Sequence, residues 1–205
     1  MKKILIAVPC MDEVSALFAQ SLAMLQKEYE CAVSFKRSSL VYASRNALAE
    51  LAVKQEFDYM MWFDSDMVFS PDTLQKLLAD DKDIVSGIYF KRNPPYSPVF
   101  YDRMDGDLES GLRFYDATTY PEGVFEVAGI GFGCVLMKTD VLFDVCGKFG
   151  DWFSPIGKCG EDLSFCYRAQ ACGYKIWLDS RVKCGHDGRL TVTEDLYRAY
   201  KGEMK

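Results

Sequence analysis

Two aspartates, Asp64 and Asp66, stand one residue apart directly after the apolar run Tyr59–Phe63. A short and almost wholly apolar run of this kind predicts a strand that is covered on both faces. Ligands of open α/β sheets bind at the carboxyl ends of the strands, which is where these two acids would lie. Carboxylate oxygens suit Mg²⁺ and Mn²⁺, which also take phosphate oxygens. The pair therefore predicts a cation site that stabilises a departing diphosphate, with capping of a surface turn as the structural alternative.

A second acidic pair, Glu161 and Asp162, follows Gly160 at the predicted start of a helix over Glu161–Cys172. The helix dipole stabilises carboxylates in the first turn, so capping alone could explain the pair. A carboxylate there could also act as a general base that takes a proton from an attacking hydroxyl. The sequence leaves both interpretations open.

His186 is the only histidine of the chain and follows Gly185 in a loop after the short predicted strand Val182–Cys184. Its neutral imidazole could be the third protein ligand of a Mn²⁺ ion held by the two aspartates. The alternative is a structural histidine, which is the usual role of an isolated one.

Two further features could face a bound ligand. Arg45-Asn46 lies in the predicted second helix, where Arg45 could contact a diphosphate or a base, or lie on a solvated face. The run Gly129–Gly133 alternates glycine with larger residues between two predicted strands. It does not open a helix, so it does not meet the dinucleotide-binding pattern. Its glycines are expected to let the backbone pack closely against a bound group.

Strand and helix patterns alternate over the first ninety residues, which predicts a parallel sheet with helices on both faces. The predicted strands are Ile4–Val8, Cys31–Phe35, Tyr59–Phe63 and Ile84–Phe90, and helix starts are expected at Asp12, at Ser38-Ser39 and at Ser70-Pro71-Asp72. The second half is more mixed. It is expected to hold a loop over Lys91–Pro98, a hairpin or mobile loop over Asp102–Gly111, strands over Val124–Ala128, Cys134–Met137, Ile176–Leu178 and Val182–Cys184, and a helix over Thr193–Lys201.

The composition limits the function classes. With 205 residues, of which 49% are hydrophobic, the chain can form one well-packed domain. It carries 24 basic and 30 acidic residues and has no Lys/Arg run longer than two, which argues against a nucleic-acid polymer as partner. The longest apolar stretch, Val127–Met137, is too short to span a membrane. With no export signal recognised, the cytoplasm is the expected compartment, and the eight cysteines are expected to be reduced.

Taken in order, these pieces resemble a glycosyltransferase of the GT-A fold, closest to the compact family 2-like enzymes of bacteria and their phages. The resemblance extends from Lys3 to Asp187. It is carried by Val8-Pro9-Cys10, Ser44-Arg45-Asn46-Ala47-Leu48-Ala49, Trp62-Phe63-Asp64-Ser65-Asp66-Met67, Gly131-Phe132-Gly133-Cys134, Gly160-Glu161-Asp162-Leu163-Ser164-Phe165-Cys166 and Gly185-His186.

The resemblance implies an α/β, Rossmann-like nucleotide-diphospho-sugar transferase fold with a mostly parallel central sheet flanked by helices. Residues 1–205 would form one domain, with a nucleotide-sugar-binding half over 1–100 and an acceptor and catalytic half over 101–205. The activity would be hexosyl transfer from a nucleoside diphosphate sugar, with a UDP-sugar favoured and with Mn²⁺ or Mg²⁺ as cofactor. The acceptor would be a carbohydrate, a lipid or a protein, and the location the cytoplasm of a bacterium or of a phage-infected host.

The same resemblance assigns roles to single residues. Asp66 would bind the cation, His186 would complete its site, and Asp64 would help through the ribose or a metal-bound water. Asp162 would be the base that deprotonates the acceptor hydroxyl, with Glu161 beside it, and the sugar would be transferred with inversion. The residues that would border the nucleotide or the donor sugar are Pro9, Cys10, Arg45, Asp64, Ser65, Gly131 and Gly133. The family's acidic residue near the end of the second strand, which reads the base, has no counterpart around Ser34–Ser39.

Two other functions remain as alternatives. A nucleotidyltransferase usually carries a glycine-rich, basic loop after its first strand, where this chain has the acidic, glycine-free Pro9-Cys10-Met11-Asp12-Glu13. A non-catalytic carbohydrate-binding protein of the same fold would not need the complete set of Asp64, Asp66, Asp162 and His186.

Overall fold

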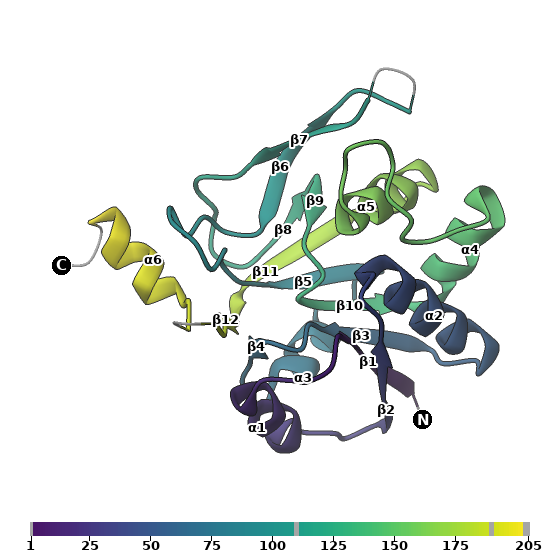
Figure 1. Ribbon diagram of the computed structural model, residues 1–205, viewed down its shortest axis with the longest axis horizontal. Coiled ribbons are helices and arrows are strands. Elements are labelled where there is room, and N and C mark those ends of the chain that lie inside the picture. Colours follow the sequence, from purple (N-terminus) through teal and green to yellow (C-terminus); the bar gives the residue numbers. More distant parts are fainter. Residues whose placement is uncertain (1, 109–110, 189–190, 203–205) are drawn as a thin grey trace.

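The structure is a computed structural model, and it describes residues 2–108, 111–188 and 191–202. Within those residues the chain forms a central sheet with helices on both faces and a smaller hairpin sheet above it (Figure 1). The strands are β1 Lys3–Cys10, β2 Glu30–Arg37, β3 Tyr59–Phe63, β4 Met67–Val68, β5 Ile84–Ile88, β6 Phe100–Asp105, β7 Arg113–Asp116, β8 Val124–Val127, β9 Gly129–Ile130, β10 Cys134–Lys138, β11 Ile176–Lys183 and β12 Gly185–His186. The helices are α1 Ala16–Met24, α2 Val41–Lys54, α3 Thr73–Ala79, α4 Thr139–Phe149, α5 Glu161–Ala171 and α6 Glu194–Lys201.

The central sheet has the strand order β2-β1-β3-β10-β5-β11-β8. Strands β2, β1, β3, β5 and β11 run parallel to one another, while β10 and β8 run antiparallel to their neighbours. The predicted α/β fold with a mostly parallel sheet is therefore confirmed. Strand β10, from the second half of the sequence, lies between β3 and β5, so strands of both predicted halves form this one sheet. The division into a nucleotide half and an acceptor half stays a prediction.

The alternation of side chains along β1 explains its wholly apolar sequence. Leu5 and Ala7 point to the face covered by α2, α4 and α5, where they join a core that includes Leu48 and Ala52. Ile4, Ile6 and Val8 point to the other face, which α1 and α3 cover. Because successive residues of a strand face opposite sides, a strand between two helical layers has no polar side.

Several local predictions differ from the structure. Helix α1 is capped by Ser15, whose Oγ accepts a hydrogen bond from the Phe18 N–H at 3.0 Å; Asp12 pairs instead with Arg37. Helix α4 was not predicted, because its first residue directly follows β10 without a turn signal. Strand β11 is continuous where two short strands were expected, since the polar residues Asp179 and Ser180 are buried within it.

The polar stretch Asp102–Gly111 contributes to a hairpin, one of the two predicted outcomes. Strands β6 and β7 pair antiparallel, and β6 also pairs with β9. Residues 109 and 110 lie outside the described residues. No helix in the described part of the chain has both the length and the apolar character that a membrane span requires.

The glycines of the predicted close-packing run make room for Tyr89, a buried residue that follows β5. A Cβ on Gly131 would overlap the Tyr89 hydroxyl and lie 2.7 Å from Cγ1 of Val99. A Cβ on Gly133 would lie 2.8 Å from Cζ of Tyr89. The Gly133 N–H donates to the Tyr89 hydroxyl oxygen at 3.2 Å, so the ring cannot move aside without losing this bond. The close approach at these glycines is therefore made by Tyr89. The expected approach of this backbone to a donor sugar stays a prediction.

We expect Gly131→Ala to lower the free energy of unfolding by about 1–3 kcal/mol, since the added methyl overpacks the core. Gly147→Ala is the matched control, because a Cβ there meets no atom within 4 Å and the residue lies inside α4. That variant should be more stable than the wild type by roughly 0.5–1 kcal/mol. Urea unfolding followed by circular dichroism measures both. Equal stability of Gly131→Ala and the wild type would refute the packing role assigned to this glycine.

Candidate active site

A cleft of about 420 Å³ opens at the carboxyl ends of β1 and β3. It brings together residues that lie more than 170 positions apart in the sequence, and nine of the eleven predicted site residues line it. The two exceptions are Gly131 and Gly133, which pack against Tyr89. The cleft is lined by Pro9, Cys10, Met11, Ser38, Ser39, Val41, Ser44, Arg45, Asp64, Ser65, Asp66, Arg92, Glu161, Asp162 and His186.

Backbone pairing places His186 beside Asp66. After β3 the chain turns at Asp64, whose carbonyl accepts from the Met67 N–H at 3.1 Å. The short strand β4 that follows pairs antiparallel with β12, so that His186 lies opposite Met67. The Asp187 N–H donates to the Asp66 carbonyl at 2.7 Å and closes the arrangement.

The ring of His186 is oriented by two neighbours. Its Nδ1 lies 2.9 Å from the Phe90 carbonyl oxygen, and the ring packs edge-on against Tyr89 at 5.6 Å between centroids. A carbonyl can only accept, so Nδ1 carries a hydrogen. Nε2 then faces Oδ2 of Asp66 at 3.5 Å. A lone pair on Nε2 opposite a carboxylate oxygen needs a proton or a cation between them, and a second-shell bond of this kind is typical of metal-binding histidines.

Arg92 also reaches Asp66, and sequence reasoning missed it. Its Nη1 donates to Asp66 Oδ2 at 2.8 Å, the same oxygen that faces His186. Burial would raise the pKa of the Asp66 carboxyl, but His186 and Arg92 outweigh it and hold that pKa below its ordinary value. The signal that could have found Arg92 is the basic pair Lys91-Arg92 immediately after a buried strand.

The predicted metal ligands share the cleft without forming one cluster. Within the described ranges, no three His, Cys, Asp or Glu side chains converge as a ready-made metal site. Asp66 and His186 face each other, whereas the carboxylate of Asp64 is turned to Arg45.

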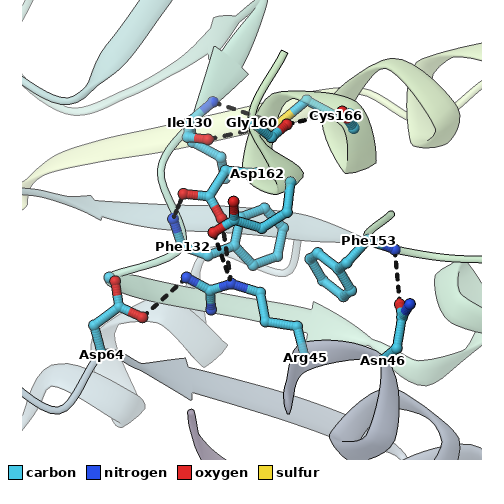
Figure 2. Close-up of polar contacts among 12 residues, drawn as sticks. Arg45, Asn46, Asp64, Ile130, Phe132, Phe153, Gly160, Asp162 and Cys166 are labelled. Carbon is cyan, nitrogen blue, oxygen red and sulfur yellow. Dashed lines mark hydrogen bonds and ion pairs between the residues drawn. The ribbon is translucent and has the colours of Figure 1, made fainter. Parts of the chain in front are cut away.

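Arg45 is buried among carboxylates. Figure 2 shows its guanidinium between Asp64 and Asp162. Its Nη2 lies 2.9 Å from Asp64 Oδ1, and its Nε lies 3.3 Å from Asp162 Oδ1 and 3.6 Å from Glu161 Oε1. The side chain is 1% exposed. Burial by itself would lower the pKa of Arg45, but Asp64, Asp162 and Glu161 together raise it.

This burial corrects one of the two interpretations of Arg45 made from the sequence, because the side chain does not lie on a solvated helix face. Its guanidinium is engaged by protein carboxylates, and the expected contact with a diphosphate stays a prediction. Aromatic rings complete its surroundings: those of Trp62 and Phe132 lie 5.6 and 5.4 Å from the guanidinium carbon. Arg45 is therefore a positioning residue that holds the acids of β3 and α5 together.

Asn46, the next residue of α2, fixes the loop that leads into α5. Its side-chain amide nitrogen donates to Asp151 Oδ1 at 2.8 Å. Its side-chain carbonyl oxygen accepts from the Phe153 N–H at 2.8 Å (Figure 2). Arg168 of α5 donates to the Trp152 carbonyl at 2.9 Å. Helix α2 thus positions the start of α5 through two successive residues.

Asp162 lies in the first turn of α5, and its two oxygens have different neighbours. Oδ2 accepts from the Phe132 N–H at 3.2 Å. Oδ1 lies 3.3 Å from Arg45 Nε; it is buried and has no hydrogen-bond partner in the described part of the chain. Burial is the main cause that raises the pKa of this carboxyl, Arg45 opposes it, and the charges of Glu161 and Asp64 raise it further, to about 7. A carboxyl with a pKa near neutral pH is suited to accept and return a proton.

Comparisons with known proteins agree with this geometry. Residues 18–103 match the family model Anp1, a mannosyltransferase family of the GT-A type; the match covers less than half of the chain. The structure of A197 from STIV superposes with a TM-score of 0.68 at 20% identity, over 94% of this chain and 91% of that one. GalNAc-T7, crystallised with UDP, GalNAc and Mn²⁺, superposes with a TM-score of 0.61 at 11% identity, over 91% of this chain and 44% of that one. No curated protein matches the sequence.

By these comparisons the chain has a GT-A-like α/β fold. The fold class predicted from the sequence is confirmed, and the family match over residues 18–103 agrees with the predicted resemblance. The roles of individual residues rest on the geometry described above.

The cleft continues into a shallower depression of about 320 Å³ at the end of β2. Its lining shares Met11, Ser38 and Ser39 with the cleft and adds Asp12 and Arg37. Asp12 Oδ1 accepts from Arg37 Nη2 at 2.5 Å. The end of β2 thus has a nearby carboxylate after all, supplied by the β1–α1 loop, which no pattern within Ser34–Ser39 could show.

We expect Arg45→Met to lower the free energy of unfolding by about 3–5 kcal/mol, because it leaves three carboxylates without their buried counter-charge. Arg37→Met is the matched control: its ion pair with Asp12 is exposed, so its loss should leave stability nearly unchanged. Chemical denaturation at neutral pH compares the two. Similar losses in both variants would contradict the central position of Arg45.

The raised pKa of Asp162 gives a pH dependence with a definite sign. The folded state holds the proton more tightly than the unfolded state, so this stabilisation is complete below about pH 4 and is lost as the pH rises through about 7. Asp162→Asn cannot titrate. In EDTA, the stability of this variant relative to the wild type should therefore rise by on the order of 2 kcal/mol between about pH 5 and about pH 8. If the free energies of unfolding of Asp162→Asn and the wild type changed equally over this pH range, the raised pKa of Asp162 would be refuted.

Proposed function

We propose that the protein transfers a hexosyl group from a nucleoside diphosphate sugar, with a UDP-sugar favoured, to an acceptor hydroxyl with inversion. The observation that carries the proposal is the cleft itself. It combines the facing pair of Asp66 and His186 with a carboxyl, Asp162, whose pKa is raised to about 7. Asp66 and His186 suit a leaving diphosphate, and the carboxyl of Asp162 suits an attacking hydroxyl.

The donor would lie along the carboxyl ends of β1 and β3. Pro9, Cys10 and Ser65 border this part of the cleft, and the depression with Asp12 and Arg37 extends it. We assign the base to that depression and the diphosphate to the region of Ser65 and Asp66. The UDP in the GalNAc-T7 structure supports the preference for a uridine donor.

The residues present fit a divalent cation. The bond from His186 Nδ1 to the Phe90 carbonyl leaves Nε2 directed at Asp66, and a carboxylate with an imidazole nitrogen is a donor set that Mn²⁺ accepts. Asp66 and His186 would hold the ion, and Asp64 would help through the ribose or a metal-bound water. When bound, the cation would neutralise charge on the departing diphosphate. Mn²⁺ in the GalNAc-T7 structure supports this choice, with Mg²⁺ as the alternative.

Asp162 would take the proton of the acceptor hydroxyl on its carboxylate. The hydroxyl oxygen then forms a bond to the anomeric carbon as the bond from that carbon to the diphosphate breaks. A single displacement of this kind inverts the anomeric centre. Arg45 fixes the position of Asp162, and Glu161 adds the negative charge that helps to raise its pKa.

The acceptor would be a carbohydrate, a lipid or a protein. We place its site on the side of the cleft formed by α5, toward the hairpin β6–β7 and the loop around Trp152. The cytoplasm of a bacterium or of a phage-infected host is the proposed location.

The first test is hydrolysis of donors. We expect the protein to release nucleoside diphosphate from one member of a panel of UDP- and GDP-sugars when Mn²⁺ is present, and not when EDTA replaces it. Asp66→Ala should abolish release by loss of the cation site, whereas Asp162→Ala should still bind the donor. Glu50→Ala, in the exposed pair with Lys54 on α2, is the control and should behave as the wild type.

Calorimetry on the same samples separates the possible failures. Donor binding without release in any mixture of candidate acceptors would contradict the catalytic role and favour a carbohydrate-binding protein of this fold. No Mn²⁺-dependent binding of UDP or GDP would contradict the nucleotide-sugar donor.

A further inference from the structure

Two side chains, Arg92 and His186, face the same oxygen of Asp66. Oδ2 accepts a hydrogen bond from Arg92 at 2.8 Å and faces His186 Nε2 at 3.5 Å. A cation held by Asp66 and His186 would have to lie within about 2.2 Å of both atoms. The guanidinium therefore occupies space next to the position that the proposed cation needs.

We propose that Arg92 and a divalent cation exclude one another at Asp66, and that the displaced guanidinium then binds the diphosphate of the donor. The inference rests on the proposed function, since it concerns the cation and the donor assigned there. Arg92 then occupies the cation site while no cation is bound, and it binds the donor once the cation is present.

Exclusion follows from charge. The guanidinium is always protonated, and two cations on one carboxylate oxygen repel each other. Arg92 balances Asp66 in the free protein, as the lowered pKa of Asp66 reflects. A divalent ion supplies the same balance with twice the charge, so Arg92 is no longer needed there and is repelled.

The two arginines of the cleft differ in their freedom to move. Arg45 is 1% exposed and touches three carboxylates. The side chain of Arg92 is 51% exposed and lies in the loop between β5 and β6. An exposed ion pair is weak, because water competes for both partners. Arg92 can therefore change partner at little cost, whereas Arg45 cannot.

The new partner is defined by the same cleft. Arg92 lines it together with Ser38, Ser39 and Ser65, so a side chain that leaves Asp66 remains next to the region assigned to the diphosphate. The charge of Arg45 is already neutralised by acids. Of the two arginines in the cleft lining, Arg92 is therefore the one available to bind phosphate oxygens. A planar guanidinium also matches the geometry of two such oxygens.

The test compares Arg92→Ala with the wild type in two binding measurements on the full chain. Free Mn²⁺, followed by electron paramagnetic resonance without nucleotide, should bind the variant roughly 5-fold more tightly, because its competitor is gone. UDP, titrated by calorimetry at saturating Mn²⁺, should bind the variant roughly 5- to 10-fold more weakly, because a phosphate contact is lost. Arg92→Lys keeps the charge and should fall between the two in both measurements.

Lys91→Ala is the matched control. It removes the same charge one residue away, but Lys91 pairs with Asp116 and does not line the cleft. It should leave both affinities unchanged. Mn²⁺ affinity in Arg92→Ala that equals or falls below that of the wild type would overturn the proposal, and so would unchanged UDP affinity.

Asp66→Ala distinguishes this failure from that of the proposed function. If Asp66→Ala loses Mn²⁺ while Arg92→Ala binds it as the wild type does, only the exclusion is wrong. If Asp66→Ala binds Mn²⁺ as tightly as the wild type does, or if neither Asp66→Ala nor the wild type binds it, the proposed cation site is wrong. The proposed exclusion by Arg92 is then wrong as well.

Discussion

The active-site cleft depends on one buried cation. Arg45 neutralises acids from two elements nearly a hundred residues apart, Asp64 after β3 and Glu161 and Asp162 at the start of α5. Three carboxylates and one guanidinium leave a net charge of −2 when all are ionised (−3 and +1), and the carboxylates that carry it are only partly exposed to water. A proton on Asp162 relieves part of it, which is why burial and neighbouring acids raise its pKa. The cluster that holds the cleft together therefore also raises the pKa of Asp162, the residue proposed as the general base.

A second constraint acts through the backbone and not through charge. Strands β4 and β12 have two residues each, yet their pairing sets His186 against Asp66 with the register fixed by hydrogen bonds. The Phe90 carbonyl then fixes the tautomer of His186. Asp162 is positioned by α5 and the Asp66–His186 pair by the pairing of β4 with β12, so the two groups come together only in the cleft.

The sequence predicted the parts of the fold that local patterns encode. Strand β3 was predicted with its bounds, because an apolar run ends abruptly at Asp64, and the acids at the carboxyl end of that strand do line the cleft. Helix α4 was missed because it starts where β10 ends, and the antiparallel insertion of β10 depends on long-range pairing that no local pattern contains. The same applies to side-chain partners. Arg45 reads as a surface residue of α2 until three distant acids surround it, and the role of Gly131 depends on Tyr89, which lies forty residues before it.

The two aspartates of Asp64-Ser65-Asp66 are equivalent in sequence and different in structure. Asp64 pairs with a buried guanidinium, and breaking such a pair is costly because it leaves a charge without water or partner. Asp66 pairs with an exposed one, and the exchange of an exposed partner costs little. Asp64 is therefore tied to the acids of α5, whereas Asp66 is the carboxylate that can accept a new cation without loosening the cluster. A cleft that keeps its shape while it exchanges ligands needs one acid with a buried partner and one with an exposed partner. One intervening residue is enough to separate the two roles, because Asp64 directly follows β3 whereas Asp66 lies beyond the turn.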